Sequence, residues 1–135
     1  MTDARIEKVY EDKVRAREFL AQAQRFLNDA NTTTLSSESQ AVLLHNATMA
    51  ACDAVLQAVG LRVTAGYRAH VIRLEAACAE LPGGDTEELL ESLDASRERR
   101  NEASYAAGIV SRASVTEARE ATTELIELTR QFLSP

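Results

Sequence analysis

The stretch SESQAVLLHNATMAACDAVLQAVG, residues 37–60, decides the fold of this chain. It is the most hydrophobic segment of the sequence, and it is rich in Ala and Leu, two strong helix formers. Ser37 and Gln40 have the spacing of a capping box at its start. Gly60 can adopt the left-handed conformation that ends many helices. The segment is therefore predicted to be a long helix at the centre of the molecule.

One helix is predicted before this central segment and three are predicted after it. Before it, apolar residues recur every three or four positions from about Ala4 to Ala30, and the polar run NTTT at 31–34 ends the pattern. After it, stop and capping signals delimit the other three: about Tyr67 to Leu81, stopped by PGG at 82–84; a helix capped by Asp85 and Glu88 and ended or bent by Gly108; and a helix capped by Ser114 and Glu117.

The organisation of the whole chain follows from these helices. No stretch alternates between apolar and polar residues as a half-buried strand would, and there is no internal repeat or domain boundary. Hydrophobic residues make up 45% and charged residues 27%, as in a globular rather than a disordered protein. The 135 residues are enough for one core. We therefore expect a single all-α domain over residues 1–135, an antiparallel bundle of about five helices.

The net charge of −6 and the placement of the cysteines limit which partners and which cellular compartment are expected for the protein. Proteins that coat nucleic acid unspecifically are basic, because lysine and arginine supply most of that affinity, so this class is excluded. The N-terminus is charged and has no apolar leader, and no stretch approaches the ~18 apolar residues of a membrane span. Cys52 and Cys78 lie in apolar helical stretches and are predicted to be buried thiols, with a disulfide as the alternative. We expect a cytoplasmic protein that does not enter a membrane.

The segment SRERRNEASY, residues 96–105, is the strongest candidate for a binding surface. It follows a leucine-rich stretch on the same predicted helix and replaces apolar side chains with three arginines. Arg97, Asn101 and Tyr105 share one helical stripe at four-residue spacing, and Arg100 lies on the adjacent one. The arginine fork suits phosphate or carboxylate recognition, and Asn and Tyr add hydrogen-bonding groups. The alternative is a solvated face on which neighbouring glutamates pair with the arginines.

Together with the helix order, this segment resembles the HEPN family (higher eukaryotes and prokaryotes nucleotide-binding). The resemblance rests on the Ala-rich second helix AVLLHNATMAACDAVLQAVG, on the Ala69-His70 pair in the third helix, and on Arg100-Asn101 late in the fourth. HEPN domains are small helical bundles that usually dimerise, so the resemblance implies a homodimer through the second and fourth helices. The ribonuclease members carry an Arg, often a polar follower, and a His after four to six residues.

Tyr105 stands where that His would be, and the difference bears on the chemistry. Metal-independent RNA cleavage needs groups that exchange protons near neutral pH, which suits a histidine of pKa about 6.5 and not a tyrosine of pKa about 10. Arg100 can still clamp a phosphate, and Asn101 can orient it. Residues five apart on a helix also point about 140° apart. Arg100 and Tyr105 therefore converge only if the helix distorts or a twofold partner contributes.

The resemblance thus implies a noncatalytic HEPN-like module that holds RNA, a nucleotide or a partner protein at its arginine-rich helix. The alternative is a metal-independent ribonuclease, a toxin of a toxin–antitoxin or phage-defence system, with a cognate antitoxin or nucleotidyltransferase as its partner and Tyr105 as a modification acceptor. A third interpretation is that the arginines only seal the dimer against acidic residues. The binding residues are Arg97, Arg99, Arg100, Asn101 and Tyr105, and the catalytic candidates are Arg100, Asn101 and Tyr105.

Three other polar residues are candidates for supporting roles. His45 and His70 are the two histidines of the chain, and a hydrogen-bonded structural role is the default for His45. The alternative is that one of them reaches the arginine cluster and replaces the missing motif histidine. Neither a metal site nor a cofactor is predicted, because clustered ligands and a glycine-rich loop are both lacking. Asp53 lies in an apolar setting and is expected to pair with an arginine of another helix, with the Arg97–Arg100 cluster as one source.

Overall fold

The computed structural model describes residues 2–32, 34–83, 86–105 and 110–134, without the side chains of residues 100–105. Within these ranges the chain forms five helices and one two-stranded sheet, so the predicted all-α class is confirmed. The elements in chain order are β1 (Ile6–Lys8), α1 (Lys13–Ala30), α2 (Ser37–Val59), β2 (Leu61–Val63), α3 (Ala69–Glu80), α4 (Thr86–Tyr105) and α5 (Arg112–Leu133).

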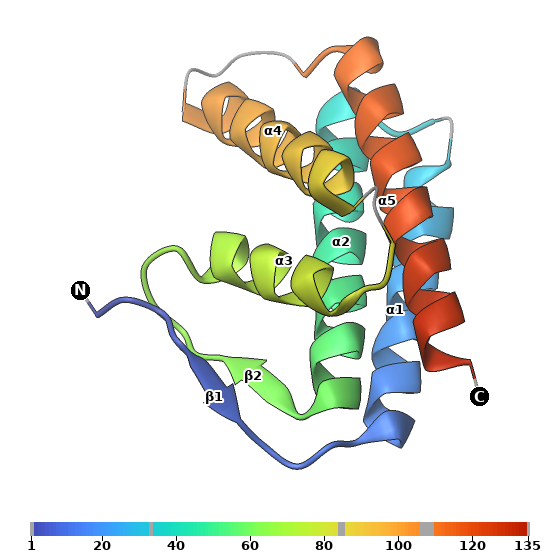
Figure 1. Cartoon of the computed structure of the whole chain (residues 1–135). Coiled ribbons are helices and arrows are strands. Elements are labelled where there is room, and N and C mark those ends of the chain that lie inside the picture. The colour runs from blue at the N-terminus through green and yellow to red at the C-terminus, as the bar shows by residue number, and fades with distance from the viewer. Residues whose placement is uncertain (1, 33, 84–85, 106–109, 135) are drawn as a thin grey trace.

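The helices form two groups around α2. Figure 1 shows α1, α2 and α5 running side by side, with α1 antiparallel to α2. Helices α3 and α4 instead cross α2 at a steep angle and contact each other. The predicted antiparallel packing of neighbours therefore holds for α1 and α2. Helices α3 and α4 also run in opposite directions, but they lie across the bundle (Figure 1). This crossing brings the start of α3 and the end of α4 to the same side of α2 (Figure 1).

Helix α2 is the core helix because its neighbours cover most of its surface. The side chains of Leu44, Cys52, Val55 and Leu56 are at most 2% exposed. By length and composition α2 could cross a membrane, so the prediction that no stretch approaches a membrane span was wrong by that measure. However, 61% of its apolar window is buried inside the protein. That burial is typical of the central helix of a soluble protein.

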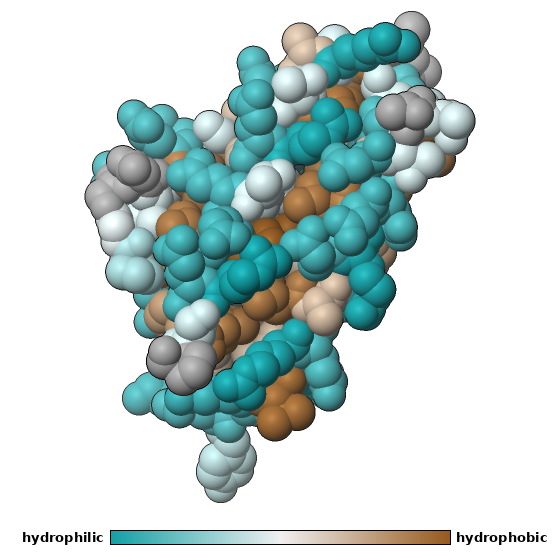
Figure 2. Space-filling view, turned by 90° about the vertical axis from the view of Figure 1, so that its right-hand side faces the viewer, coloured by the Kyte–Doolittle hydropathy of each residue, from teal (hydrophilic) through white to brown (hydrophobic). Residues whose placement is uncertain are grey.

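The helices α1 and α5 bury one face each and leave the other to solvent. Helix α1 buries Ala16, Ala23 and Leu27, and α5 buries Leu125 and Ile126. Figure 2 shows the side of the molecule that lies to the right in Figure 1, where α5 runs. Hydrophilic residues cover most of this face, and hydrophobic residues form a band between them. Such a mixed face is expected where amphipathic helices pack on a central helix.

The helix caps follow the predicted chemistry but not the predicted residues. The N-cap of α2 is Ser36 rather than Ser37, and that of α5 is Ser111 rather than Ser114. In both, the serine hydroxyl accepts a hydrogen bond of 3.1 Å from the backbone N–H three residues later. The earlier serine serves because only a residue with extended backbone before the helix can aim its side chain at these N–H groups. The predicted role of Gly60 is confirmed by its left-handed φ of 75°.

The first helix starts later than predicted. It begins at Lys13 rather than near Ala4, because the Asp12 carboxylate caps it by accepting the N–H of Arg15 at 2.9 Å. The residues before it form β1, which pairs antiparallel with β2. A strand of three residues is too short to show an alternating pattern. The stop after α3 agrees with the prediction, whereas the predicted cap Asp85 and the predicted helix end Gly108 lie outside the described residues.

Gly60 should tolerate no side chain. A Cβ there would lie 2.7 Å from the backbone oxygen of Val9 and 3.2 Å from Cγ of Glu11. We expect Gly60→Ala to lower the free energy of unfolding by about 2–3 kcal/mol, because it adds a steric clash to left-handed strain. Urea denaturation of the purified variant measures this loss.

Gly83→Ala is the matched control, since Gly83 also has a positive φ, of 120°, but no atom of the described residues lies within 4 Å of its added Cβ. Its loss should be smaller, about 1 kcal/mol, and come from backbone strain alone. Equal losses in the two variants would show that the close approach of Val9 contributes nothing.

Candidate functional site

The candidate site begins with two histidines that the fold brings into contact. His45 lies on α2 and His70 lies in the first turn of α3. The centroids of their rings are 5.2 Å apart, in an edge-to-face arrangement with an interplanar angle of 72°. His45 is half-buried and His70 is exposed. The two histidines of the chain therefore share one location at the junction of α2 and α3.

Arg97 of α4 connects two hollows that meet at this junction. Its Nε donates a hydrogen bond of 3.1 Å to Oδ1 of Asp94, and its Nη2 lies 4.0 Å from Oε1 of Glu98. The Arg97 side chain is 21% exposed. It lines a hollow that also contains His45 and a second one that also contains His70. Arg97 is thus an anchored, partly buried cation that shares the lining of one hollow with His45 and of the other with His70.

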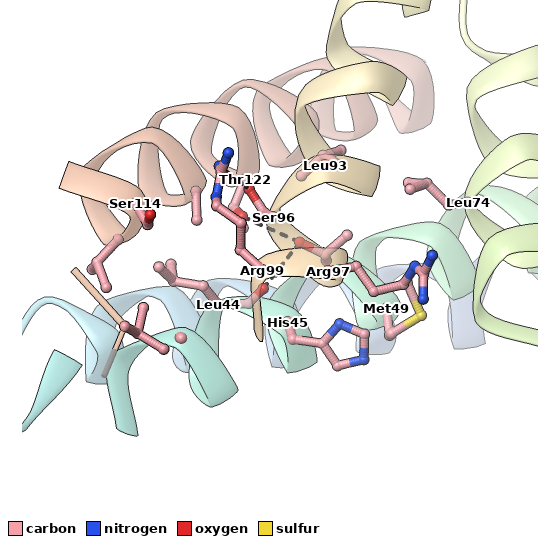
Figure 3. A pocket seen from close by; sticks show the side chains of 15 residues that line it. Leu44, His45, Met49, Leu74, Leu93, Ser96, Arg97, Arg99, Ser114 and Thr122 are labelled. Atoms are coloured by element: carbon pink, nitrogen blue, oxygen red, sulfur yellow. Dashed lines mark hydrogen bonds between the residues drawn. The ribbon is translucent and has the colours of Figure 1, made fainter. Parts of the chain in front are cut away.

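The first hollow, called the inner pocket, lies between α2, α4 and α5 and has a volume of about 40 Å³. Its walls are mostly apolar, and His45, Arg97 and Arg99 line it together with the hydroxyls of Thr48 and Thr122. Figure 3 shows the His45 ring and the Arg97 side chain at the same end of the pocket, while Arg99 extends towards α5. The volume suits a few water molecules rather than a nucleotide.

The second hollow, called the outer groove, is larger and more open, with a volume of about 450 Å³. It lies between the start of α3 and α4, and its size is in the range usual for ligand sites. Two arginines and three carboxylates line it beside the exposed His70. With neutral histidine, the described residues that line it carry a net charge of −1. The charged lining residues are Arg68, Arg97, Glu75, Asp94 and Glu98.

Arg99, predicted as a binding residue, is engaged elsewhere. Its Nη2 donates to Oε2 of Glu117 on α5 at 3.0 Å and to Oγ of Ser96 at 3.4 Å. The ion pair links α4 to α5 and is largely exposed. The alternative that flanking glutamates pair with the arginines holds for Arg97, whose Nη2 lies 4.0 Å from Glu98. It does not hold for Arg99, whose partner Glu117 comes from another helix.

The remaining motif residues can be placed only along the backbone. Arg100, Asn101 and Tyr105 belong to α4, with Asn101 one turn after Arg97. Their side chains lie outside the described residues. The roles predicted for them, a phosphate clamp at Arg100, an orienting donor at Asn101 and a replacement of the motif histidine at Tyr105, remain predictions.

Asp53 is paired as predicted, but with an arginine of α3. Its Oδ1 lies 3.3 Å from Nε of Arg73, whereas Arg97 and Arg99, the arginines of the suggested cluster whose side chains are described, pair with other carboxylates. Partial burial raises the pKa of the Asp53 carboxyl, and the charges of Arg73 and Arg15 offset only part of that effect. The pair lies among α1, α2 and α3 and lines neither hollow. Asp53 is therefore a structural residue.

The two cysteines are buried free thiols, as predicted. Burial raises the pKa of Cys78 to about 11, and it also raises that of Cys52. At neutral pH both therefore stay protonated and unreactive. Within the described ranges, no three His, Cys, Asp or Glu side chains gather as a metal ion would require.

Sequence reasoning missed the residues that shape the outer groove. Tyr67 and Arg68 were assigned to a helix start, but they form the loop before α3, and Arg68 has a left-handed φ of 65°. No local sequence signal marks an arginine for that conformation. Asp94 was detectable, because its three-residue spacing from Arg97 places the two side chains together on a helix.

Comparison with protein-family models, with curated proteins and with solved structures found no match to this chain. The function therefore has to be argued from the geometry of the inner pocket and the outer groove.

The raised pKa of Asp53 predicts a specific pH dependence of stability. The folded state holds the Asp53 proton more tightly than the unfolded chain does. The cost of its charge is therefore absent at low pH and appears as pH rises through the folded pKa. Asp53→Asn should become more stable relative to the parent as pH rises from about 4 to 7, by about 1.4 kcal/mol for each tenfold difference in proton affinity.

Urea denaturation of both proteins across this pH range measures the difference. Cys52→Ser is not a suitable control because it disturbs the core, whereas Glu120→Gln changes an exposed carboxylate and should leave the profile unaltered. If Asp53→Asn instead loses stability relative to the parent as pH rises, the Arg73 ion pair outweighs the desolvation of Asp53.

Proposed function

We propose that this protein is a small HEPN-like binding module that holds a phosphate-bearing ligand, RNA or a nucleotide, at the outer groove. The observation that carries the proposal is the convergence of His45, His70 and Arg97 from three different helices on one junction. Imidazole and guanidinium groups are the usual side-chain donors to phosphate oxygens. Their meeting at the edge of an open groove supports an anion site.

Arg97 is suited to this role because it is already oriented. The Asp94 carboxylate fixes its Nε, Glu98 lies 4.0 Å from its Nη2, and the side chain lines both hollows. An arginine held in this way loses little side-chain entropy when a ligand binds. Arg100 and Asn101, further along α4, are proposed to extend the same surface.

The carboxylates of the outer groove bear on the kind of binding. Glu75, Asp94 and Glu98 lower the local positive potential, and the whole chain carries a net charge of −6. Affinity for phosphate chains in general should therefore be low. We infer a ligand recognised at a few defined positions and bound in a salt-sensitive manner.

The assembly and the setting complete the proposal. We propose a cytoplasmic homodimer through α2 and α4, in which a second copy doubles the arginines along the groove. A cognate antitoxin or nucleotidyltransferase is the partner that the HEPN resemblance suggests. Equilibrium sedimentation at several protein concentrations tests the dimer, and a constant monomer mass would exclude it.

Replacing Arg97 should weaken ligand binding without unfolding the protein. We expect the parent to bind a labelled single-stranded RNA with an affinity that falls as salt rises, and Arg97→Ala to bind about tenfold more weakly, because one charged hydrogen-bond donor is lost. Fluorescence anisotropy at two salt concentrations measures both effects, and thermal denaturation confirms that the variant is folded.

Arg130→Ala is the matched control, since Arg130 lies near the end of α5 and binds Glu127 and Gln24 rather than lining either hollow. It should bind RNA as the parent does. If RNA binding is weakened equally in Arg97→Ala and Arg130→Ala, the loss comes from the change in overall charge, and a site at Arg97 is contradicted.

The contact between the histidines favours a second candidate function, a metal-independent ribonuclease. One neutral imidazole could take the proton of the 2′-OH as its oxygen bonds to phosphorus. The other, protonated, could give a proton to the leaving 5′ oxygen as that bond breaks. Arg97 would stabilise the charge on the phosphate oxygens. This pair would supply the acid and base that Tyr105 cannot.

The two candidates differ in whether RNA is cleaved in EDTA. For the ribonuclease we expect a bell-shaped pH profile, products with 2′,3′-cyclic phosphate ends, and a loss of about 100-fold or more in His45→Ala and in His70→Ala. Arg130→Ala again serves as the control. Binding without cleavage in the parent would support the noncatalytic module, and cleavage by Tyr105→His alone would identify a nuclease scaffold that lacks its base.

A further inference from the structure

We propose that the ring of Tyr67 is a stacking platform for one unpaired base of the ligand, whose phosphate lies deeper in the outer groove at Arg68 and Arg97. This inference rests on the proposed function and names the ligand class more closely as an unpaired nucleotide, from a single strand or free in solution. Tyr67 lines the outer groove together with both arginines and is 57% exposed.

The backbone of Tyr67 is fixed although its side chain is exposed. Its N–H donates to the carbonyl of Thr2 at 3.0 Å, and its carbonyl accepts from the N–H of Ala4 at 3.1 Å. The N-terminal segment thus binds the loop before α3 through both the N–H and the carbonyl of Tyr67. An exposed aromatic ring on a fixed backbone retains only two side-chain torsions, so little conformational entropy is lost when it stacks on a base.

The residues on either side of Tyr67 show that this loop is built tightly. A Cβ on Gly66 would lie 2.5 Å from the carbonyl oxygen of Thr2, so only glycine fits there. Arg68 is the one non-glycine residue of positive φ in the part of the chain that the structure describes. Such a conformation is unfavourable for arginine, yet it places Arg68 beside Tyr67 at the groove. A loop that needed only to connect β2 to α3 could use glycine at this position.

The charges of the groove favour a short, unpaired ligand over a duplex. Bases in a duplex have their faces covered by neighbours, so only an unpaired base offers a free face to Tyr67. A phosphate chain running along the groove would meet the carboxylates of Glu75 and Glu98. One nucleotide with its base on Tyr67 and its phosphate at the arginines avoids that repulsion.

The test uses the absence of tryptophan from the chain. In Tyr67→Trp the single indole would lie at the proposed platform, and stacking of a base quenches its fluorescence. Tyr10→Trp is the matched control, because Tyr10 is 96% exposed and lines none of the groove. We expect quenching by a single-stranded RNA in Tyr67→Trp and none in Tyr10→Trp.

Three ligands distinguish the sources of the nucleotide. A single-stranded RNA, the duplex of the same sequence and free adenosine monophosphate are titrated in turn. Quenching by the single strand supports the platform. If the mononucleotide also quenches, a free nucleotide can bind there; if it does not, the nucleotide must be part of a strand. Quenching only by the duplex would overturn the inference.

Two further variants separate stacking from the phosphate site. Tyr67→Ala should bind single-stranded RNA about tenfold more weakly, whereas Tyr67→Phe should keep most of the affinity, because stacking needs the ring and not its hydroxyl. Arg68→Gly should also bind more weakly while remaining at least as stable, since glycine accepts the same backbone conformation.

The outcomes keep the two proposals apart. If the parent binds RNA and Arg97→Ala binds weakly, but Tyr67→Ala binds as the parent does and Tyr67→Trp shows no quenching, the platform is wrong and the binding module stands. If the parent binds neither the RNA nor the mononucleotide, the proposed function fails and the platform fails with it.

Discussion

The close packing around α2 is the constraint on which the rest of the structure depends. Ala47, Ala51 and Ala54 are fully buried, and such small side chains let the neighbouring helices approach closely. Between α2 and α5 the buried hydroxyls of Thr48 and Thr122 lie 3.1 Å apart. Because Thr48 donates to the carbonyl of Leu44, Thr122 must be the donor in this pair, which fixes the register of α5 on α2. The remaining side of α2 is left for α3 and α4.

The N-terminal segment is the second constraint, and it acts on the site rather than on the core. Its strand β1 pairs with β2, and its first residues bind the loop before α3. The N-terminus of the chain therefore helps to determine where α3 begins. The ion pair of Asp53 with Arg73 joins α2 to α3 further along. The position of His70 against His45 is therefore fixed from two sides.

The helical architecture was predictable from the sequence because it depends on local signals. The Ala- and Leu-rich stretch, Gly60 and the proline stop all act within one turn of where they stand. Strand β1 was not predictable, because a three-residue strand exists only through a partner more than fifty residues away. The partners of Asp53 and Arg99 escaped prediction for the same reason, since chemistry demanded a counter-ion but only the packing of helices selects which one.

The candidate site was predictable in its elements and not in its geometry. The arginine-rich half of α4 and the two histidines stand out in the sequence, but their meeting depends on the crossing of α3 and α4 over α2 (Figure 1). The periodicity of apolar residues along a helix does not determine the angle at which that helix crosses another one. The sequence therefore indicated which side chains to consider, and the fold brings the two histidines together and places Arg97 in the lining of a hollow with each of them.

The two described arginines of the motif differ in a way that bears on function. Arg99 has its counter-ion on α5, so its charge links two helices and has a structural use. Arg97 has both of its carboxylate neighbours on its own helix, so among the described residues its ion pairs join no two elements. An exposed pair within one helix contributes only about 0.3–0.5 kcal/mol, and the partly exposed Arg97–Asp94 pair joins residues of the same helix as well. Stability alone is thus a weak reason for a partly buried arginine at this position, and the proposed binding at the outer groove would give it a stronger one.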